Sequence, residues 1–432
     1  PAHKVSLLSH LKAGSPTLLS DIRRLWDSLH PNVSGENNRF FDDLGRRWGV
    51  AITLGIVVER GSVSLRSIYE AISMIRADFD AWLDRAAIMA EDGPADLEPV
   101  FGEMAAMNSG EARLYDSVMS GLTNAVSFMA DPAYQETFVD DHEADFTLDV
   151  LTRNDGVSRH VAFIEDPELI GTNAAPIRQF FSTTRTLKQR AVGSPPVEFI
   201  IDEAAALGRF DEIAELYSIG RGMGVTPVAA YQDRGQITRN LGPTGAQTLS
   251  ANAAAELILG GGVRDLATAQ DVSRRLGNQT LALDDRLTQE RAKQAKRELT
   301  HAVLFKGLDP AEAAQQMQRL RYEVGHQRKI SRALMEPNEV LGLDAARTLV
   351  MAGGYQLPPF LAGKVPYWKR RDLAGLFFPN PYVTSDMHAI EVPGRFWTSR
   401  RAIIEETVPA RFSHLPQYRD GRPLRYIEGF KP

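Results

Sequence analysis

The chain has 432 residues, of which 43% are hydrophobic and 24% are charged, as is usual for a globular protein of two or three domains. It contains no cysteine, which excludes disulfides, thiol nucleophiles and cysteine-ligated zinc. Its nine histidines include no pair at the H-x₃₋₅-H spacing, which disfavours a histidine metal site. The net charge of −6 argues against a uniformly basic DNA clamp.

The first 130 residues are predicted to be helical. Apolar side chains recur at three- and four-residue spacing, and no strand signal interrupts them. The longest apolar run has eleven residues, fewer than the roughly 20 that a bilayer crossing needs. The expected helices, which form an all-helical module ahead of a sheet domain, cover residues 16–29, 36–59, 62–92 and 97–128.

From about residue 145 the pattern changes to alternating strands and helices. Short connections between them are typical of βαβ units, so we expect a parallel sheet. The charged residues 282–299 are expected to form an exposed helix or excursion. The expected strands cover residues 160–165, 197–202, 225–233, 256–261 and 348–354. The expected helices cover residues 175–191, 210–224, 246–254 and 263–277, the last closed by Gly277 as C-cap.

Two carboxylates, Asp202 and Glu203, stand at the end of the apolar strand "VEFII". Ligands of open parallel sheets bind beyond the carboxyl ends of the strands. There, one acid can hold Mg²⁺ through a water, and the second can orient an attacking water. This pair is typical of the Walker B motif of nucleotide hydrolases. A core strand that ends at a solvated acidic turn explains the same residues, and the motif alone leaves both interpretations open.

The phosphate-binding half of such a site is absent from the sequence. No G-x-x-x-x-G-K-[ST] string, whose backbone N–H groups and lysine bind phosphates, occurs in the 432 residues. The nearest string, residues 242–248, has two glycines but no lysine. We interpret it as a turn that leads to a helix starting near Thr248.

The tail, residues 364–432, differs in composition from the rest. It holds 12 Lys/Arg against 7 Asp/Glu, together with eleven aromatic residues and eight prolines. Basic and aromatic residues together are typical of single-strand nucleic-acid contact. An irregular arm that packs on its own domain or on a partner explains the composition equally, and we favour the arm.

The order of four motifs resembles the TraG/VirD4 coupling proteins of type IV secretion. Residues 200–209, "IIDEAAALGR", resemble the family's "LLDEFAALGR" block. The strings at 218–233, 248–277 and 328–368 are similar to the three blocks that follow it. Residues 40–57 resemble the aromatic-rich helix that precedes the family's all-α domain. The resemblance covers roughly residues 1–370.

The resemblance implies a RecA-like parallel sheet with flanking helices and an inserted all-α domain. Residues 1–59 would belong to the nucleotide-binding domain, 60–130 to the all-α domain, 131–363 to the Walker B half of the RecA-like domain, and 364–432 to the tail. The family's members are hexameric ATPases anchored in the bacterial inner membrane, on its cytoplasmic face. They use ATP and Mg²⁺, and feed a relaxase–DNA complex or an effector protein to the secretion channel.

The resemblance also assigns roles to single residues. Asp202 matches the acid that binds Mg²⁺ through water, and Glu203 matches the catalytic base. Gln232 matches the sensor amide, and Arg221 matches an arginine finger that serves the neighbouring subunit. Without the resemblance, Gln232 is a strand-end amide that caps a turn, and Arg221 is a cation at a helix C-terminus.

Family members open with transmembrane helices and a P-loop strand and helix, which have no counterpart here. We therefore expect a fragment, and an ATPase only if the Walker A segment is supplied. Two functions remain open: an ATP-driven coupling motor that can contact DNA, and a docking platform that recruits secretion substrates without hydrolysis.

Overall fold

The computed structural model divides into two compact units, residues 1–256 with 365–432, and residues 257–364. The finer division predicted from the sequence, with boundaries after residues 59, 130 and 363, stays a prediction. The described residues are 3–30, 39–165, 174–283, 286–325, 328–373, 376–378, 388–394, 396–413, 418 and 421–430.

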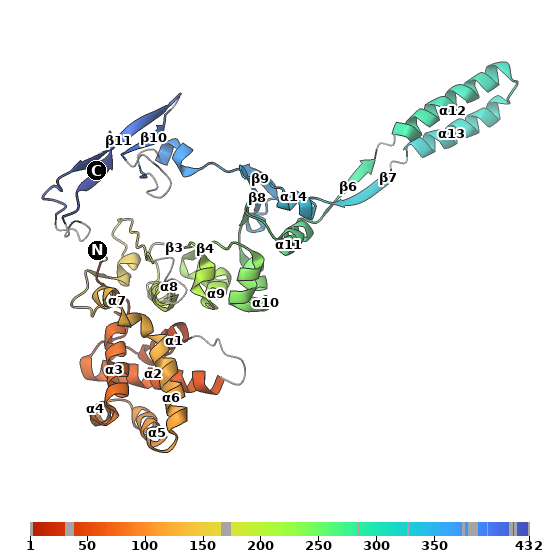
Figure 1. Ribbon diagram of the computed structural model, residues 1–432. Helices are drawn as coiled ribbons and strands as arrows, with labels where there is room; N and C mark the ends of the chain where they lie inside the picture. Colours follow the sequence, from red (N-terminus) through yellow and green to blue (C-terminus); the bar gives the residue numbers. More distant parts are fainter. Residues whose placement is uncertain are drawn as a thin grey trace. The chain divides into compact units, whose positions relative to one another are not determined.

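The N-terminal residues predicted to be helical form helices (Figure 1), although the single helix expected over 97–128 is interrupted at Glu111. The helix expected over 62–92 divides at Asp78, whose carboxylate accepts a hydrogen bond of 3.0 Å from the Ala81 N–H and so caps the second half. Residues 36–38 of the expected helix 36–59 lie outside the described residues. The helices are α1 Leu18–Leu29, α2 Arg39–Arg60, α3 Leu65–Ala77, α4 Phe79–Asp92, α5 Leu97–Gly110, α6 Ala112–Ala125 and α7 Pro132–Thr137.

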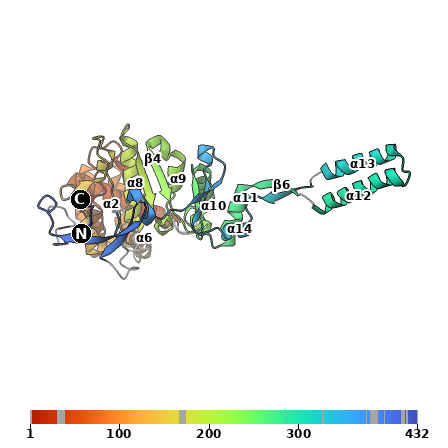
Figure 2. The same cartoon turned by 90° about the horizontal axis from the view of Figure 1, so that it is seen from above.

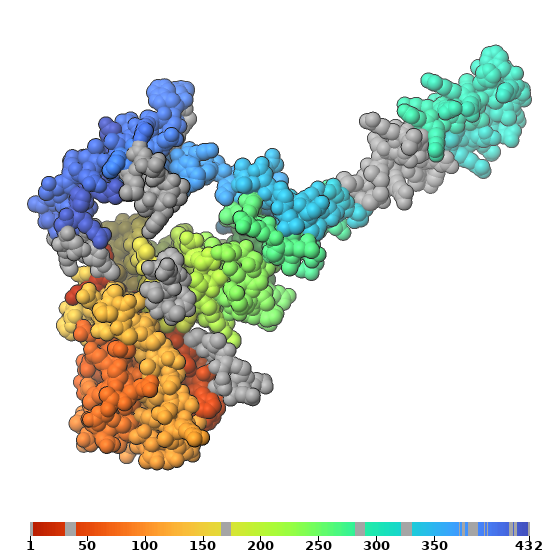
Figure 3. Space-filling model, in the orientation of Figure 1, coloured from red at the N-terminus to blue at the C-terminus, as the bar shows by residue number. Residues whose placement is uncertain are grey.

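Helix α2 lies at the centre of this part and contacts α1, α3, α4, α5 and α6. The indole of Trp26 packs on Gly49, where an added Cβ would lie 2.3 Å from a ring carbon. The Trp26 Nε1–H donates a hydrogen bond of 2.9 Å to Thr53 Oγ1, which satisfies a fully buried donor. In Figure 3 these helices form one continuous body, coloured red to orange.

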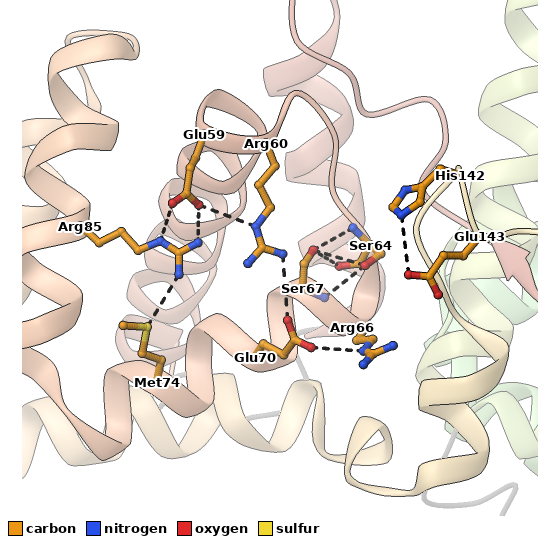
Figure 4. Close-up of polar contacts among 10 residues, drawn as sticks. All are labelled: Glu59, Arg60, Ser64, Arg66, Ser67, Glu70, Met74, Arg85, His142 and Glu143. Atoms are coloured by element: carbon orange, nitrogen blue, oxygen red, sulfur yellow. Dashed lines mark hydrogen bonds and ion pairs between the residues drawn. The ribbon is translucent and has the colours of Figure 1, made fainter.

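Ion pairs lie at the surface of the helices (Figure 4). The Glu59 carboxylate accepts two hydrogen bonds from Arg85, and Arg66 donates one of 3.2 Å to Glu70. Exposed pairs of this kind contribute about 0–1 kcal/mol each. The apolar core therefore supplies most of the stability of this part.

Two parallel strands, β3 Val197–Ile201 and β4 Val225–Ala229, position the acid pair. One face is covered by α8 Ala174–Arg190 and α9 Glu212–Ile219 (Figure 2). The rings of Phe181 in α8 and Phe199 in β3 lie 5.1 Å apart. The opposite face is exposed to solvent, as the exposed fractions of the Ile200 (69%) and Val228 (51%) side chains show.

The turn expected at residues 242–248 is present, but the helix start expected near Thr248 is wrong. Helix α10, Arg234–Asn252, kinks at Gly242, whose φ of 69° suits glycine, and resumes at Pro243. Proline is tolerated at the first position of a helix because the amide hydrogen it lacks would have no partner there. Helix α10 therefore begins at Arg234, well before the residues that the sequence pattern predicted to be helical.

The strand expected at residues 160–165 is absent. The segment has no strand hydrogen-bonding among the described residues, although Phe163 packs 6.0 Å from Phe180 and 6.1 Å from Phe138. The apolar side chains of Val161 and Phe163 pack, partly buried, against the core, and this needs no partner strand.

The residues of the second unit form their own sheets. Strand β5 Glu256–Leu259 joins β8 Arg347–Met351 and β9 Phe360–Gly363, and β8 pairs with β9 antiparallel. The antiparallel pairing of β9 departs from the purely parallel arrangement expected from the alternation, because the alternation does not encode which strands pair. Helices α11 Leu266–Leu276 and α14 Pro337–Leu341 contact each other beside the buried Ile258 and Leu349.

The excursion predicted at the charged residues 282–299 extends over more of the chain than those residues. An antiparallel ribbon of β6 Asn278–Leu283 and β7 Arg328–Ala333 leads into two helices, α12 Arg286–Phe305 and α13 Pro310–Gly325 (Figure 1). The tail is not irregular, since β10 Ala389–Pro393, β11 Thr398–Glu406 and β12 Leu424–Ile427 form an antiparallel sheet.

Candidate functional site

The acid pair directly follows β3, at the carboxyl end of the parallel strands. Both side chains are exposed, and Asp202 makes no hydrogen bond or ion pair with another described residue. Glu203 has φ 56° and ψ 54°, a left-handed conformation that non-glycine residues rarely adopt. Such strained residues cluster at functional sites. The turn ends β3 and places two carboxylates in solvent at the sheet edge.

Gln232 lies beside this pair. Its Nε2 donates a hydrogen bond of 3.0 Å to Glu203 Oε2. The parallel register, which sets Ile201 opposite Ala229, brings the two strand ends together. The backbone continues the pairing, because the Ala204 N–H donates to the Ala230 carbonyl at 2.9 Å. The structure therefore brings Glu203 and Gln232 together at the ends of neighbouring strands.

Further polar groups hold the Gln232 backbone and β4. Gln236 Oε1 accepts a hydrogen bond of 2.9 Å from the Gln232 N–H, and Asp233 caps α10 by accepting from the Gln236 N–H at 2.8 Å. The Tyr217 hydroxyl accepts from the Ala229 N–H at 3.2 Å. These contacts fix the Gln232 amide toward the acid pair.

Two buried side chains support the turn after Glu203, and sequence reasoning missed both. Asn240 Nδ2 donates to the Ala205 carbonyl at 2.7 Å. Arg178 donates to the carbonyls of Leu207 and Ser28, at 2.8 and 2.9 Å. Burial lowers the pKa of the Arg178 guanidinium to about 10, so it stays charged at neutral pH. The first turns of α8, residues 174–182, are mostly apolar or small, and an arginine among them was the available signal.

Arg221 lies away from the acid pair. It belongs to the short 3-10 helix Gly220–Met223 before β4, whereas Gln232 follows the other end of β4. Five residues of strand span roughly 17 Å. The Arg221 side chain is exposed and makes no hydrogen bond or ion pair with another described residue. This separation keeps Arg221 out of the site of its own chain.

The donors suit a water-mediated Mg²⁺ ion better than a directly ligated metal. Among the described residues no group of three or more His, Asp or Glu side chains could ligate a metal. Asp202 and Glu203 offer exposed carboxylate oxygens to the waters that Mg²⁺ retains. The described side chains supply the part of a nucleotide site that faces Mg²⁺ and water. The part that binds the phosphates is missing, because the sequence has no P-loop.

Sequence comparisons identify relatives for part of the chain. Residues 196–345 match the family described as "TraM recognition site of TraD and TraG". Over 178 residues, 41% of the chain, it is 25% identical to a type IV secretion system-coupling protein VirD4 of Bartonella quintana (strain Toulouse). The VirD4 of Bartonella henselae is 24% identical over the same length. The match spans 23% of each Bartonella protein.

Solved structures show a similar fold. The bacterial conjugative coupling protein TrwBdeltaN70, in its trigonal form with sulphate, has a TM-score of 0.53 at 18% identity, covering 80% of this chain and 68% of that one. TrwB in complex with the ATP analogue ADPNP has a TM-score of 0.51 at 17% identity, covering 84% and 78%. The predicted fold class, a RecA-like α/β fold with a helical domain, is confirmed.

No described helix has both the length and the hydrophobicity needed to cross a bilayer.

Proposed function

Because the chain is related to the TraG/VirD4-type coupling proteins, we propose that it carries the Walker B half of a coupling ATPase. This ATPase recruits a relaxase–DNA complex or an effector protein and feeds it to a type IV secretion channel. The family match and the VirD4 relatives confirm the resemblance predicted from the sequence. The observation that carries the proposal is the exposed acid pair held beside Gln232.

Each residue has a role in this proposal. Asp202 binds a water of the Mg²⁺ ion, and Glu203 accepts the proton of the attacking water. Gln232 orients that water through the amide that contacts Glu203. Bound MgATP supplies the phosphate to be transferred and a divalent charge. A P-loop, which the 432 residues lack, must come from a further polypeptide segment.

Arg221 completes the site of a neighbouring copy in a homohexamer. Its distance from the acid pair of its own chain, and its exposed side chain, which has no partner among the described residues, support this role. A cation that arrives from a neighbour stabilises transition-state charge, worth about 10³–10⁵ in rate. We place the assembly at the cytoplasmic face of the bacterial inner membrane, beside the secretion channel and in possible contact with DNA.

Substrate transfer from cells tests the function. We expect Glu203→Gln to reduce transfer to background, since it removes the base but keeps the shape. Glu198→Gln is the matched control, because Glu198 is exposed on the same strand but lies near its amino end, whereas the acid pair follows its carboxyl end. It should transfer at the wild-type level.

The alternative is a docking platform without hydrolysis, which the missing P-loop favours. It predicts that Glu203→Gln and Glu198→Gln both transfer as the wild type does. That result would contradict the motor.

A further inference from the structure

The α12–α13 helix pair encloses a groove of about 820 Å³. Leu299, Ala302 and Leu320 form its apolar floor, and Figures 1 and 2 both show the two helices side by side. Of the side chains described between residues 290 and 320, Ala313 alone is buried. Most of the stability of protein helices comes from packing an apolar face, so this pair leaves a face to be covered.

Three cations, Arg297, Lys306 and Arg319, line the same groove. None of them forms an ion pair or hydrogen bond with another described residue, and Glu298 is the one carboxylate among the described lining residues. Helix α12 carries five Lys/Arg against two Asp/Glu, although the whole chain has a net charge of −6. Like charges gathered around an apolar floor favour an occupant with an apolar stripe between acidic flanks.

We propose that this groove binds an acidic amphipathic helix of a partner protein, which completes a three-helix bundle. The partner's apolar residues, at i, i+3, i+4 and i+7, cover Leu299, Ala302 and Leu320. Its carboxylates pair with Arg297, Lys306 and Arg319. A second copy of the hairpin would bring the same cations to the groove, so charge disfavours self-association. The proposal does not depend on nucleotide hydrolysis.

A designed peptide tests the groove. The probe is a fluorescent helix of about 16 residues, long enough to follow α13, with a leucine stripe flanked by glutamates. Anisotropy titrations with the 432-residue protein should show saturable binding. A scrambled peptide of the same composition, and one with lysine in place of each glutamate, should bind about tenfold more weakly or not at all.

Charge reversal locates the binding. Arg297→Glu with Arg319→Glu should weaken the acidic peptide about tenfold and strengthen the lysine peptide. Lys293→Glu with Lys296→Glu is the matched control, because it makes the same charge change on exposed α12 residues outside the groove lining. It should change both affinities far less. Circular dichroism should show the helix content of both variants to be that of the wild type.

Four results would overturn the proposal. The scrambled peptide could bind as tightly as the probe, or the two charge-reversal variants could lose affinity equally. A DNA oligonucleotide could displace the peptide and bind more tightly, which would make the groove a nucleic-acid surface. Sedimentation could reveal a dimer that Arg297→Glu with Arg319→Glu dissolves, which would make a second copy the occupant.

Discussion

The Gln232 side-chain amide donates a 3.0 Å hydrogen bond to the Glu203 carboxylate, across two strand ends that are 29 residues apart in sequence. In the proposed function, the contact links a proton acceptor to a group that orients water. It forms at the carboxyl edge of β3 and β4, where ligands of parallel sheets bind.

Gln232→Ala is tested in a P-loop-containing protein, that is, this chain together with the P-loop segment that the proposal requires. The substitution should lower the rate of ATP turnover by a factor of about 10²–10³, the usual cost of removing one preorganised donor. The fold should survive, because Gln232 is exposed. Thr238→Ala, at an exposed position of α10, is the control and should hydrolyse ATP normally. Steady-state kinetics measure both, and an unchanged kcat in Gln232→Ala would remove Gln232 from the site.

The 432-residue chain alone should not bind MgATP at micromolar concentrations. It lacks the lysine and backbone nest of a P-loop, whose charge-assisted hydrogen bonds contribute about 1.5–3 kcal/mol each. Isothermal calorimetry checks this. Micromolar affinity would mean that other residues of this chain bind the phosphates.

Gly49→Ala should destabilise the N-terminal helices by about 1–3 kcal/mol or more, because its Cβ would lie 2.3 Å from the Trp26 ring. Gly102→Ala is the control. It lies in α5 with no atom within 4 Å of an added Cβ, so the substitution should stabilise by up to about 1 kcal/mol. Chemical denaturation measures both. Equal effects would show that Trp26 does not pack on Gly49 in solution.

His10 should make stability depend on pH. Burial, opposed by Asp21, lowers its pKa from 6.5 to about 4, and among the described residues the buried Nδ1 has no hydrogen-bond partner. The unfolded chain then binds a proton between these values that the folded chain does not, so stability should rise from about pH 4 to pH 6.5. His10→Leu should flatten this rise in denaturation midpoints. An identical slope in both proteins would exclude His10 as the cause.

Much of the fold could be predicted where local chemistry determines it. Gly277 closes α11 with φ 76°, as its position after the last apolar residue predicted. The strand carrying Asp202 and Glu203 was predicted because its apolar run ends in two charges. Strand pairing could not be predicted, because β5 and β8 are about 90 residues apart and no local signal links them.

Buried polar contacts also could not be predicted from the sequence. Arg178 acts through backbone carbonyls of Leu207 and Ser28, which any residue could supply, so no sequence pattern marks the partners. Residues 160–165 were wrongly predicted to be a strand, since partly buried side chains at alternate positions, Val161 and Phe163, give the same alternation as a strand.

The most direct test mixes two variants of the P-loop-containing protein. Glu203→Gln lacks the base, and Arg221→Ala lacks the cation proposed to act in the neighbouring site, so each should be inactive alone. Mixed rings contain interfaces with an intact Glu203 on one side and an intact Arg221 on the other, and part of the ATPase activity should return. If mixed hexamers form and no activity returns, Arg221 does not act in the neighbouring site. If Glu203→Gln alone hydrolyses ATP at the wild-type rate, the acid pair is not the hydrolytic site.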